Sequence, residues 1–467
     1  MKSYSVIIIG TGPAGMSAAN KLVNQGIKCL LLDEQIAAGG QIYRAIDRNL
    51  KHEPQRVDLL GEDYRQGSKL TEGLITNQQN ECLDIIFNAK VWRIDNNGAV
   101  YFSVNQQAQS SHADIIILAT GAQERPFAFE GWTLPGVMTA GAAQILLKAN
   151  GLVADNAILA GNGPLLYLIA SQLIKAGSPP KAILETQVTG AWKNALPHFF
   201  AALLHGLPYL WKGSKMLASI KKAGIPHYRG INDIQALGND KITSVSFSQG
   251  NKTRTLDTDT LLIHQGVIPN TQISRTLNLQ HHWNKQQHAW QPAVNKWGVS
   301  SQKNILIAGD GAGIGGAKAA EISGELAALQ ACYQLGNLSK HQQNEMASLL
   351  HRRLEKESAV RPFLDALYAP NFQSILQSDK ALICRCEEVT AGQLRHYARE
   401  GCRGLNQTKA FSRCGMGACQ GRQCGSNAAI IIADERDISV EEVDYYRLRA
   451  PIKPVSLSEV ASLDTCE

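Results

Sequence analysis

The sequence predicts an α/β protein with two Rossmann-like dinucleotide-binding domains and a small, mainly helical carboxyl-terminal domain rich in cysteine. Two glycine-rich turns, each between an apolar strand and an amphipathic helix, begin at Gly10 and Gly161. Six of the ten cysteines lie between Cys384 and Cys424. Turns of the first kind bring a helix N-terminus to a phosphate group. Crowded thiols in a chain without an export signal usually hold a metal, and four thiolates suit either zinc or a [2Fe-2S] cluster.

Length and charge limit the classes of protein that this chain can belong to. Its 467 residues are enough for about two to four domains. The formal net charge of +6 is spread thinly, because no four consecutive residues are Lys or Arg. A nucleic-acid partner is therefore not expected. The apolar stretch from Val6 to Ile9 is too short for a signal peptide or a membrane span. We expect a cytoplasmic protein without a transmembrane segment, with peripheral contact at the inner membrane face as the alternative.

The first glycine turn has every part that a dinucleotide site needs. Gly10 makes the tight turn, Gly12 lets a pyrophosphate approach the backbone, and Gly15 lets the helix pack on the strand. The next strand ends in Asp33, where a ribose hydroxyl needs a carboxylate acceptor, and Glu34 is the alternative acceptor. The residues expected around the dinucleotide at this turn are Gly10, Gly12, Pro13, Ala14, Gly15, Asp33 and Glu34.

The second glycine turn repeats this pattern with one departure. Gly161 and Gly163 match the first two glycines, but Leu166 replaces the third and would push a side chain into the contact between helix and strand. Glu185, at the end of the following strand, is placed to hold a ribose. Two interpretations stay open. Either NAD or an adenine nucleotide binds through Gly161, Gly163 and Glu185, or the fold is retained with a weak or lost site.

An aromatic and leucine-rich segment over 188–225 predicts two short helices, interrupted by Gly206 and Pro208. We expect its apolar face to be buried inside the domain, with a partner or a membrane surface as the alternative contact.

Further along, a strand over 304–308 ends in Gly309 and Asp310, before a small-residue helix over 317–334 that is aimed at a ligand. Residues 341–359 have a helical pattern and form the connector to the cysteine domain.

Several motifs resemble those of the two-dinucleotide-domain FAD oxidoreductases, the relatives of glutathione reductase and thioredoxin reductase. They are the first glycine turn with its acid, Gly39-Gly-Gln41, Ala119-Thr-Gly121 and Gly309-Asp310, and the resemblance covers about residues 1–335. It implies that the first turn binds the ADP half of FAD and that Asp310 contacts the ribityl chain. The flavin neighbours that it adds are Gly40, Gln41, Arg44, Val91, Ala119, Thr120, Gly121, Gly309 and Asp310. The redox cysteine pair of the disulfide reductases is missing, because no Cys-x-x-Cys or Cys-x4-Cys precedes residue 384.

A fuller resemblance spans nearly the whole chain. It is carried by Gly39–Arg44, His264–Asn270, Gly309–Gly316, Cys384–Thr390 and Gly415–Gly421. These motifs are similar to those of the alpha-type subunit shared by hydrogen cyanide synthase, opine oxidase, D-hydroxyproline dehydrogenase and dye-linked proline dehydrogenase. The resemblance implies an FAD- and [2Fe-2S]-containing electron-transfer subunit of a heteromeric amine, amino acid or imino acid dehydrogenase, which passes electrons to a respiratory or dye acceptor. The implied partners are a D-amino-acid-oxidase-like flavoprotein beta subunit, which oxidises the amine or imino acid, and a small ferredoxin-like subunit.

The cysteine domain, over residues 380–440, also resembles the bacterioferritin-associated ferredoxin domain. That resemblance implies a [2Fe-2S] cluster rather than zinc. Cys384 and Cys386 match its first ligand pair, and Cys419 and Cys424 are the predicted second pair. Cys414 is the alternative ligand, because Cys414 and Cys419 have the same spacing as Cys419 and Cys424.

The expected division of the chain follows from these motifs. Residues 1–150 and 290–340 form the FAD-binding domain, 151–289 the second dinucleotide-binding domain, 341–376 a helical connector, 377–450 the [2Fe-2S] domain and 451–467 an extended tail. No catalytic acid or base can be assigned, although Tyr43 and Arg125 are candidate flavin neighbours. Two rival functions are a stand-alone NAD(P)H-dependent FAD/iron-sulfur oxidoreductase and a non-catalytic redox-sensing or scaffold subunit.

Overall fold

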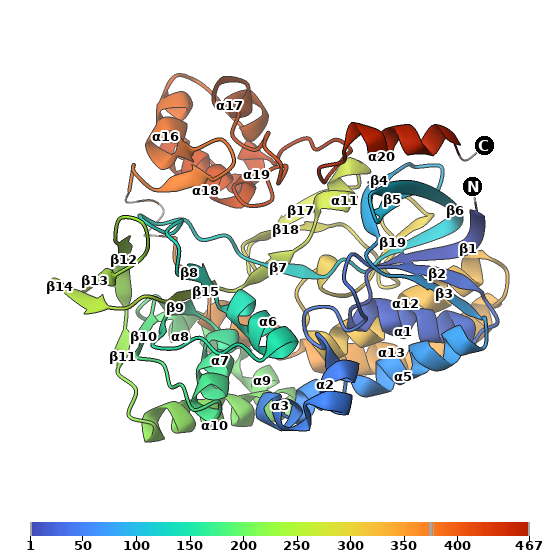
Figure 1. The fold of residues 1–467 in the computed structure, drawn as a ribbon, viewed down its shortest axis with the longest axis horizontal. Coiled ribbons are helices and arrows are strands. Elements are labelled where there is room, and N and C mark those ends of the chain that lie inside the picture. The colour runs from blue at the N-terminus through green and yellow to red at the C-terminus, as the bar shows by residue number, and fades with distance from the viewer. Residues whose placement is uncertain (1, 373–375, 377, 466–467) are drawn as a thin grey trace.

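The computed structural model describes residues 2–372, 376 and 378–465, and Figure 1 shows their arrangement. The first domain is built on a sheet with strand order β3-β2-β1-β6-β5-β4, to which β19 adds beside β6. The neighbours from β3 to β6, and β19, are parallel, whereas β4, β5 and β6 form an antiparallel meander. The strands are β1 Lys2–Ile9, β2 Cys29–Leu32, β3 Leu83–Ile86, β4 Lys90–Ile94, β5 Ala99–Val104, β6 Gln107–Leu118 and β19 Ile305–Ile307.

Helices α1 (Pro13–Val23) and α12 (Ala317–Gln334) pack against each other below this sheet in Figure 1, with α5 (Ser68–Gln79) and α13 (Lys340–Ser358) beside them. The close approach of α1 and α12 depends on Gly324, where a Cβ would lie only 2.1 Å from the carbonyl oxygen of Ala14. β2 and the second half of β1 are buried on both faces, which explains their continuous apolar runs. Smaller helices cover the first domain beyond them: α2 Ile46–His52, α3 Pro54–Leu60, α4 Glu62–Arg65 and α11 Gln272–Thr276.

The second domain repeats the parallel α/β arrangement with strand order β11-β10-β9-β15-β8. A three-stranded meander, β12-β13-β14, stands beside it, and the antiparallel pair β7-β16 and the hairpin β17-β18 lie between the two domains. The strands are β7 Ala122–Glu124, β8 Val137–Thr139, β9 Ile158–Asn162, β10 Ala182–Glu185, β11 His227–Arg229, β12 Ile231–Leu237, β13 Ser244–Gln249, β14 Lys252–Asp257, β15 Leu261–Gln265, β16 Val267–Pro269, β17 His281–Asn284 and β18 Ala289–Pro292.

The helices of the second domain include the segment that the sequence marks as aromatic. They are α6 Ala140–Asn150, α7 Pro164–Lys175, α8 Ala191–Ala195, η1 Leu196–His198, α9 Phe199–His205 and α10 Leu207–Lys222. The expectation that the apolar face of this segment is buried is wrong. Only small or inward residues such as Ala202, Met216 and Ile220 are buried, whereas Phe200 and Trp211 are exposed.

The cysteine domain is mainly helical, as predicted, and is drawn in orange in Figure 1. It consists of β20 Leu382–Cys384, β21 Val389–Thr390, α16 Ala391–Arg399, α17 Leu405–Ser412, α18 Gly425–Arg436 and α19 Val440–Val443. Ile383, Leu394 and Ile431 of this domain share one apolar core with Phe129 and Phe247 of the second domain. The cysteine domain is therefore packed onto the rest of the chain rather than tethered to it.

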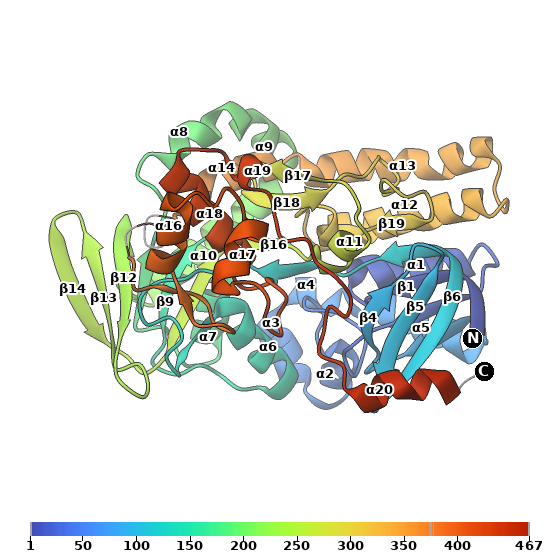
Figure 2. The same cartoon turned by 90° about the horizontal axis from the view of Figure 1, so that it is seen from above.

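The connector and the tail complete the fold. After α13 the connector forms α14 (Arg361–Leu367) and passes the second domain. Beyond the cysteine domain the chain returns to the first domain, where α20 (Leu457–Ala461) and η3 (Ser462–Thr465) lie along β6 in both views (Figures 1 and 2). Over its described residues the tail therefore contains a short helix instead of being extended throughout. Among the helices that the structure describes, none combines the length and apolar character required to cross a bilayer.

Candidate functional site

The first glycine turn is shaped by the fold and leaves room for a ligand at one position. Gly10 has a φ of +107°, and a Cβ there would lie 2.4 Å from the carbonyl oxygen of Ala119. A Cβ on Gly15 would lie 1.8 Å from the carbonyl oxygen of Gly10. At Gly12, by contrast, the nearest atom to an added Cβ is the Cα of Gly40, 4.0 Å away. Gly10 and Gly15 are thus required by packing, and Gly12 faces open space at the N-terminus of α1.

Asp33 and Glu34 play different parts beside this turn. Asp33 is buried, and its Oδ2 accepts hydrogen bonds from the backbone N and the Oγ1 of Thr11, at 2.5 and 2.6 Å. Its backbone carbonyl accepts from Ala89 N at 2.8 Å, which brings the segment that leads into Val91 on β4 to the same edge. Glu34 is half exposed and forms an ion pair with Lys453 of the tail.

The Gly39–Arg44 motif closes the site from the other side. A Cβ on Gly40 would lie 2.7 Å from the Cα of Gly12, so this turn abuts the first one. Arg44 donates through Nη2 to Gln41 Oε1 at 3.0 Å, while its Nε is buried and has no hydrogen-bond partner among the residues that the structure describes. An unpaired buried guanidinium N–H beside an open glycine turn fits the pyrophosphate of a dinucleotide.

Buried Lys148 of α6 ties the second domain to this motif. Its Nζ donates to the carbonyl oxygen of Gln41 at 3.0 Å and to Gln144 Oε1 at 2.9 Å. Full burial, followed by repulsion from Arg44, lowers the pKa of Lys148 to about 7. The sequence offers no signal for this residue, because the contact joins positions far apart in the chain.

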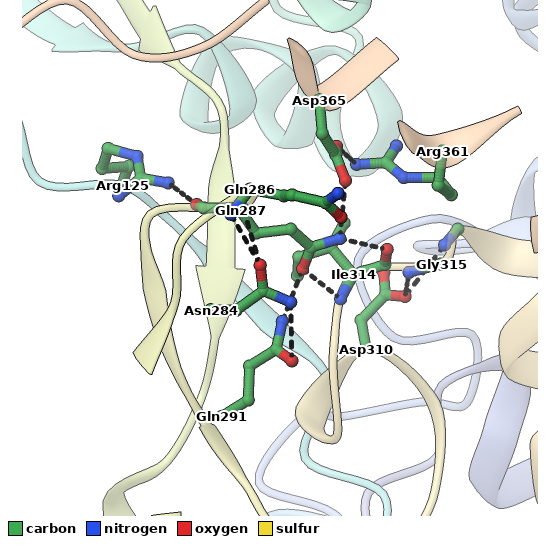
Figure 3. A network of polar contacts seen from close by, with 11 residues as sticks. Arg125, Asn284, Gln286, Gln287, Gln291, Asp310, Ile314, Gly315, Arg361 and Asp365 are labelled. Atoms are coloured by element: carbon green, nitrogen blue, oxygen red, sulfur yellow. Dashed lines mark hydrogen bonds and ion pairs between the residues drawn. The ribbon is translucent and has the colours of Figure 1, made fainter. Parts of the chain in front are cut away.

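Asp310 sits in a loop that its own carboxylate organises. Asp310 Oδ1 accepts from the backbone N of Gly315 and of Gly316, both at 2.9 Å. Figure 3 shows this loop held by Gln287 of the β17-β18 hairpin. Gln287 Nε2 donates to Ile314 O at 2.9 Å and to Asp365 Oδ2 at 3.0 Å, and Gln287 Oε1 accepts from Ile314 N at 3.0 Å. The connector thereby reaches the loop in which the ribityl contact is expected.

Tyr43 and Arg125, the other candidate flavin neighbours, have structural partners. Tyr43 donates to Glu321 Oε1 at 2.9 Å. Arg125 donates to three backbone carbonyls, those of Gln265, Gln287 and His288, at 2.7 to 3.0 Å. Burial lowers the pKa of Arg125 to about 10, so the guanidinium stays charged at neutral pH.

The crossover segment continues directly toward the cysteines. Thr120 donates to the carbonyl oxygen of Asn270 at 3.3 Å, and Gly121 O accepts from Asn270 N at 3.0 Å. Two residues further on, Gln123 Nε2 donates to the carbonyl oxygen of Arg422 at 3.2 Å. Arg422 lies in the loop between Cys419 and Cys424. Residues 120–123 therefore connect the expected flavin edge to the loop that carries Cys419 and Cys424.

The second glycine turn keeps its shape, but the residues around it are engaged within the chain. A Cβ on Gly161 would lie 1.7 Å from His264 O, and a Cβ on Gly163, which precedes α7, would lie 3.5 Å from His264 Nε2, at ordinary contact distance. Glu185 accepts a hydrogen bond from Tyr167, and its Oε2 lies 2.9 Å from His227 Nε2 and 3.4 Å from Arg229 Nε. Burial alone would raise the pKa of Glu185, but the approach of His227 and the bond from Tyr167 lower it on balance.

The connector lies across this second turn. Asn162 Nδ2 donates to the carbonyl oxygen of Ala369 at 2.8 Å, and Asn371 Nδ2 donates to that of Thr186 at 3.0 Å. The ring of Tyr368 packs edge-on against Tyr167, with centroids 6.2 Å apart. Polar groups at the carboxyl ends of β9 and β10, where a nucleotide would bind, are thus bonded to residues 368–371.

Five thiols gather in the cysteine domain. The Sγ atoms of Cys384, Cys414 and Cys424 all lie within 4.8 Å of one another and are buried. Cys386 and Cys419 contact each other and are not members of this group of three. Hydrogen bonds from Cys414 and Cys424, together with backbone N–H groups, lower the pKa of Cys384 to about 2. Such a concentration of thiols, with one held as a thiolate, fits an iron-sulfur cluster or another thiolate-bound metal.

The glycines of the thiol loop are required by packing. A Cβ on Gly417 would lie 2.2 Å from the Cβ of Cys386. On Gly415 and Gly421 it would meet the ring of Tyr446 at 2.4 and 2.5 Å. Tyr446 in turn donates to Cys414 Sγ at 3.3 Å. Cys402 is buried and lies outside the group of three neighbouring thiols among the described residues, in agreement with a packing role.

A buried arginine joins this loop to the first domain. The guanidinium of Arg275 on α11 lies 5.0 Å from the ring centroid of Trp290 and 4.2 Å from that of Tyr445. Tyr445 donates to the carbonyl oxygen of Gly421 at 3.2 Å. Burial lowers the pKa of Arg275 to about 10, which leaves it cationic. A cavity of about 20 Å³ next to this stack is lined by residues that include Trp290, Tyr445 and Arg422.

Comparisons with known proteins agree with this architecture. The family described as pyridine nucleotide-disulphide oxidoreductase matches residues 4–334, and the sarcosine oxidase A3 domain matches residues 378–463. The structure of L-proline dehydrogenase from P. horikoshii has a TM-score of 0.72 at 19 % identity, over 98 % of this chain and 79 % of that chain. The fold and the first glycine turn thus define a flavoprotein oxidoreductase with two dinucleotide-binding domains and an added cysteine domain.

Relatives with higher sequence identity identify the family to which the chain belongs. The A subunit of opine oxidase from Agrobacterium tumefaciens (strain Ach5) is 41 % identical over 98 % of this chain and 92 % of its own length. Hydrogen cyanide synthase subunit HcnB of Pseudomonas aeruginosa is 30 % identical over 98 % of both chains. The chain belongs to this family, which unites the A subunits of opine oxidases with HcnB. Membership implies that it is one subunit of an oxidoreductase. Its dinucleotide-binding domain implies FAD, and its thiols are consistent with an iron-sulfur site.

Proposed function

We propose that this chain is the FAD- and [2Fe-2S]-containing electron-transfer subunit of a heteromeric dehydrogenase that acts on an amine, amino acid or imino acid. The observation that carries the proposal is the contact of Gln123 with Arg422, 3.2 Å between Nε2 and O, because it joins the expected flavin edge to the thiol loop. Two candidate redox sites connected within one chain favour electron transfer over a purely structural cysteine domain. The relatives support the substrate class through their names, since opines are amine derivatives.

Different residues of this chain would hold the different parts of FAD. The first glycine turn and Arg44 would hold the diphosphate of FAD, Asp33 or Glu34 its ribose, and Asp310 its ribityl chain. When bound, FAD exchanges electrons in pairs and a [2Fe-2S] cluster exchanges them singly. The buried, cationic guanidinium of Arg275 packs on the ring of Tyr445. Its positive charge would stabilise negative charge on the nearby thiol loop.

For the cluster ligands we retain Cys384, Cys386, Cys419 and Cys424, with Cys414 as the alternative. The hydrogen bond with Cys384 raises the pKa of Cys414, which supports a neutral, non-ligand role for that thiol, although the hydrogen bond donated by Tyr446 lowers it. Its position beside Cys384 and Cys424 equally suits a ligand, so the choice needs the experiment described in the Discussion.

The proposed partners are a small ferredoxin-like subunit, together with a D-amino-acid-oxidase-like flavoprotein beta subunit, in the cytoplasm, with electrons passing to a respiratory or dye acceptor. Oxidation of the amine is assigned to the beta subunit. In this chain the buried candidates Tyr43 and Arg125 are both occupied by internal partners, which supports that division.

The rival NAD(P)H-dependent function is less well supported. Both oxygens of Glu185 are engaged, and residues 368–371 bond to the polar groups of the second turn. We propose that this turn takes no nicotinamide. The third candidate, a redox-sensing or scaffold subunit, would need a cluster that is not reoxidised during turnover.

The deciding experiment compares the chain alone with the chain co-purified with its proposed flavoprotein beta subunit, using an artificial dye acceptor. We expect amine-dependent dye reduction only in the complex. Fast amine oxidation by the chain alone would refute the division of labour. Rapid anaerobic bleaching of its flavin by NADH would instead favour the stand-alone enzyme.

A further inference from the structure

The outer face of helices α9 and α10 exposes an unusual number of large apolar side chains. Phe200, Leu204 and Trp211 are 75, 74 and 65 % exposed. Trp192, Leu196, Phe199, Leu203, Leu207 and Tyr209 are exposed beside them in the same segment. Figure 1 shows α10 at the lower edge of the molecule, away from the cysteine domain. We call the exposed residues from Trp192 to Lys222, on α8, η1, α9 and α10, the aromatic face.

The spacing of these residues places them on one side of each helix. On α9 the exposed positions 199, 200, 203 and 204 follow the helical repeat, and Ala202 is buried on the opposite side. On α10, Leu207 and Trp211 point outward, while Met216 and Ile220 belong to the core of the second domain. The helices are therefore amphipathic, but their large apolar side is the outer one.

The aromatic face is also uniformly basic. No Asp or Glu occurs between Thr186 and Asn232, whereas Lys193, Lys215, Lys221 and Lys222 are all exposed there. The Nζ of Lys215 lies 5.2 Å from the ring centroid of Trp211. Aromatic and leucine side chains interleaved with lysine are typical of helices that lie in a membrane interface.

The helices are held firmly, so their exposure is a property of the fold. Lys212 forms an ion pair with Asp63 of α4, and Tyr209 donates to Glu357 Oε2 of α13 at 2.5 Å. Both carboxylates, those of Asp63 and Glu357, thus already have partners on α10. Gly206 packs against Val360 of the connector. Phe200, Leu204 and Trp211 stay exposed beside these contacts.

We propose that the aromatic face docks this chain on the surface of a membrane that contains anionic lipids. The charge decides between lipid and protein occupants: a face with lysines and no acids is complementary to a layer of anionic headgroups. The large apolar side chains would enter the boundary between headgroups and acyl chains, with the helices parallel to the membrane plane. This inference goes beyond the proposed electron-transfer function and does not depend on it.

The test is co-sedimentation of the full, cofactor-loaded chain with vesicles of phosphatidylcholine alone or mixed with phosphatidylglycerol. Wild-type protein should bind the anionic vesicles, and high salt should weaken the binding. The double variant Phe200→Ser/Trp211→Ser and, separately, Lys215→Gln/Lys222→Gln should each weaken binding at least about tenfold. Leu457→Ser, an exposed apolar position on α20, and Lys252→Gln on β14 are the matched controls and should bind as wild type.

Failure of wild-type protein to bind anionic vesicles, or unchanged binding by both double variants, would overturn the proposal. Light scattering of the chain and of its complex gives a second readout. If the Phe200→Ser/Trp211→Ser variant dissociates an oligomer or releases a partner subunit while vesicle binding is unaffected, the face is a protein interface. Electron transfer to a dye should be unchanged in these variants, so failure here leaves the proposed function standing.

Discussion

Replacement of Gly12 by alanine separates what the fold requires from what the ligand requires at the first turn. The φ of Gly12 is −73°, which alanine adopts without strain, and an added Cβ would have no neighbour closer than 4.0 Å. The change reduces the entropy of the unfolded chain but weakens the helix N-cap, and the two effects oppose each other. We therefore expect the free energy of unfolding of the FAD-free chain to change by no more than about 1 kcal/mol.

The same methyl group should interfere with FAD. If the diphosphate approaches the backbone at Gly12, the added carbon occupies part of its space, at a cost of about 1–3 kcal/mol, as for an overpacked core. That cost corresponds to about 5- to 150-fold weaker binding. Titration of FAD into the FAD-free chain, followed by flavin fluorescence, measures the affinity, and thermal unfolding by circular dichroism measures the stability.

Two further variants make the result interpretable. Gly15→Ala places a Cβ 1.8 Å from the carbonyl oxygen of Gly10 and 3.3 Å from the Cβ of Ala119, so it should lower the melting temperature of the FAD-free chain by several degrees. Gly213→Ala, with no described atom within 4 Å of the added Cβ, should leave FAD affinity unchanged and should raise stability by up to about 1 kcal/mol, because Gly213 lies in the interior of α10. Wild-type FAD affinity in Gly12→Ala, or a loss of stability as large as that in Gly15→Ala, would refute the reasoning.

Three other predictions concern the thiols, the buried lysine and the second turn. Cys414→Ser should retain the visible and electron paramagnetic resonance spectra of a [2Fe-2S] cluster and Cys424→Ser should lose them; the reverse result would make Cys414 the ligand. Burial depresses the pKa of Lys148 to about 7, below its value in the unfolded chain, so the unfolded state binds the extra proton and stability should rise as pH increases from about 7 to about 10.5. Denaturant unfolding at several pH values should show a smaller rise in Lys148→Met, and identical slopes in the two proteins would contradict this. Calorimetric titration of the loaded chain with NADH should give no binding heat, and the idea of a closed second turn fails if micromolar binding is seen.

The glycine turns could be predicted from sequence because their requirements are local. Gly10, Gly12 and Gly15 lie within one strand–turn–helix unit, and the backbone geometry of that unit limits which positions tolerate a Cβ. Cysteine spacing likewise restricted the thiol group to a few sets, and the structure brings Cys384, Cys414 and Cys424 together and places Cys386 against Cys419. The small-residue helix over 317–334 was also predictable, since only small side chains allow α12 to approach α1.

The aromatic segment shows where such reasoning fails. Periodicity identifies an amphipathic helix, but it does not say whether the apolar side has a surface to cover. In this fold the second domain has already filled its core with residues such as Met216 and Ile220, so Phe200 and Trp211 remain outside.

By itself the sequence determined the class of protein: two dinucleotide-binding domains, the position of the first ligand turn and the set of thiols, all encoded by motifs of short range. Only the tertiary structure decided how these parts meet. It placed Gln123 against Arg422, Lys453 on Glu34 and Asn371 across the second turn. The partners in each of these pairs are more than 150 residues apart. The physical reason is that such contacts depend on the packing of whole domains, which no local spacing or periodicity records.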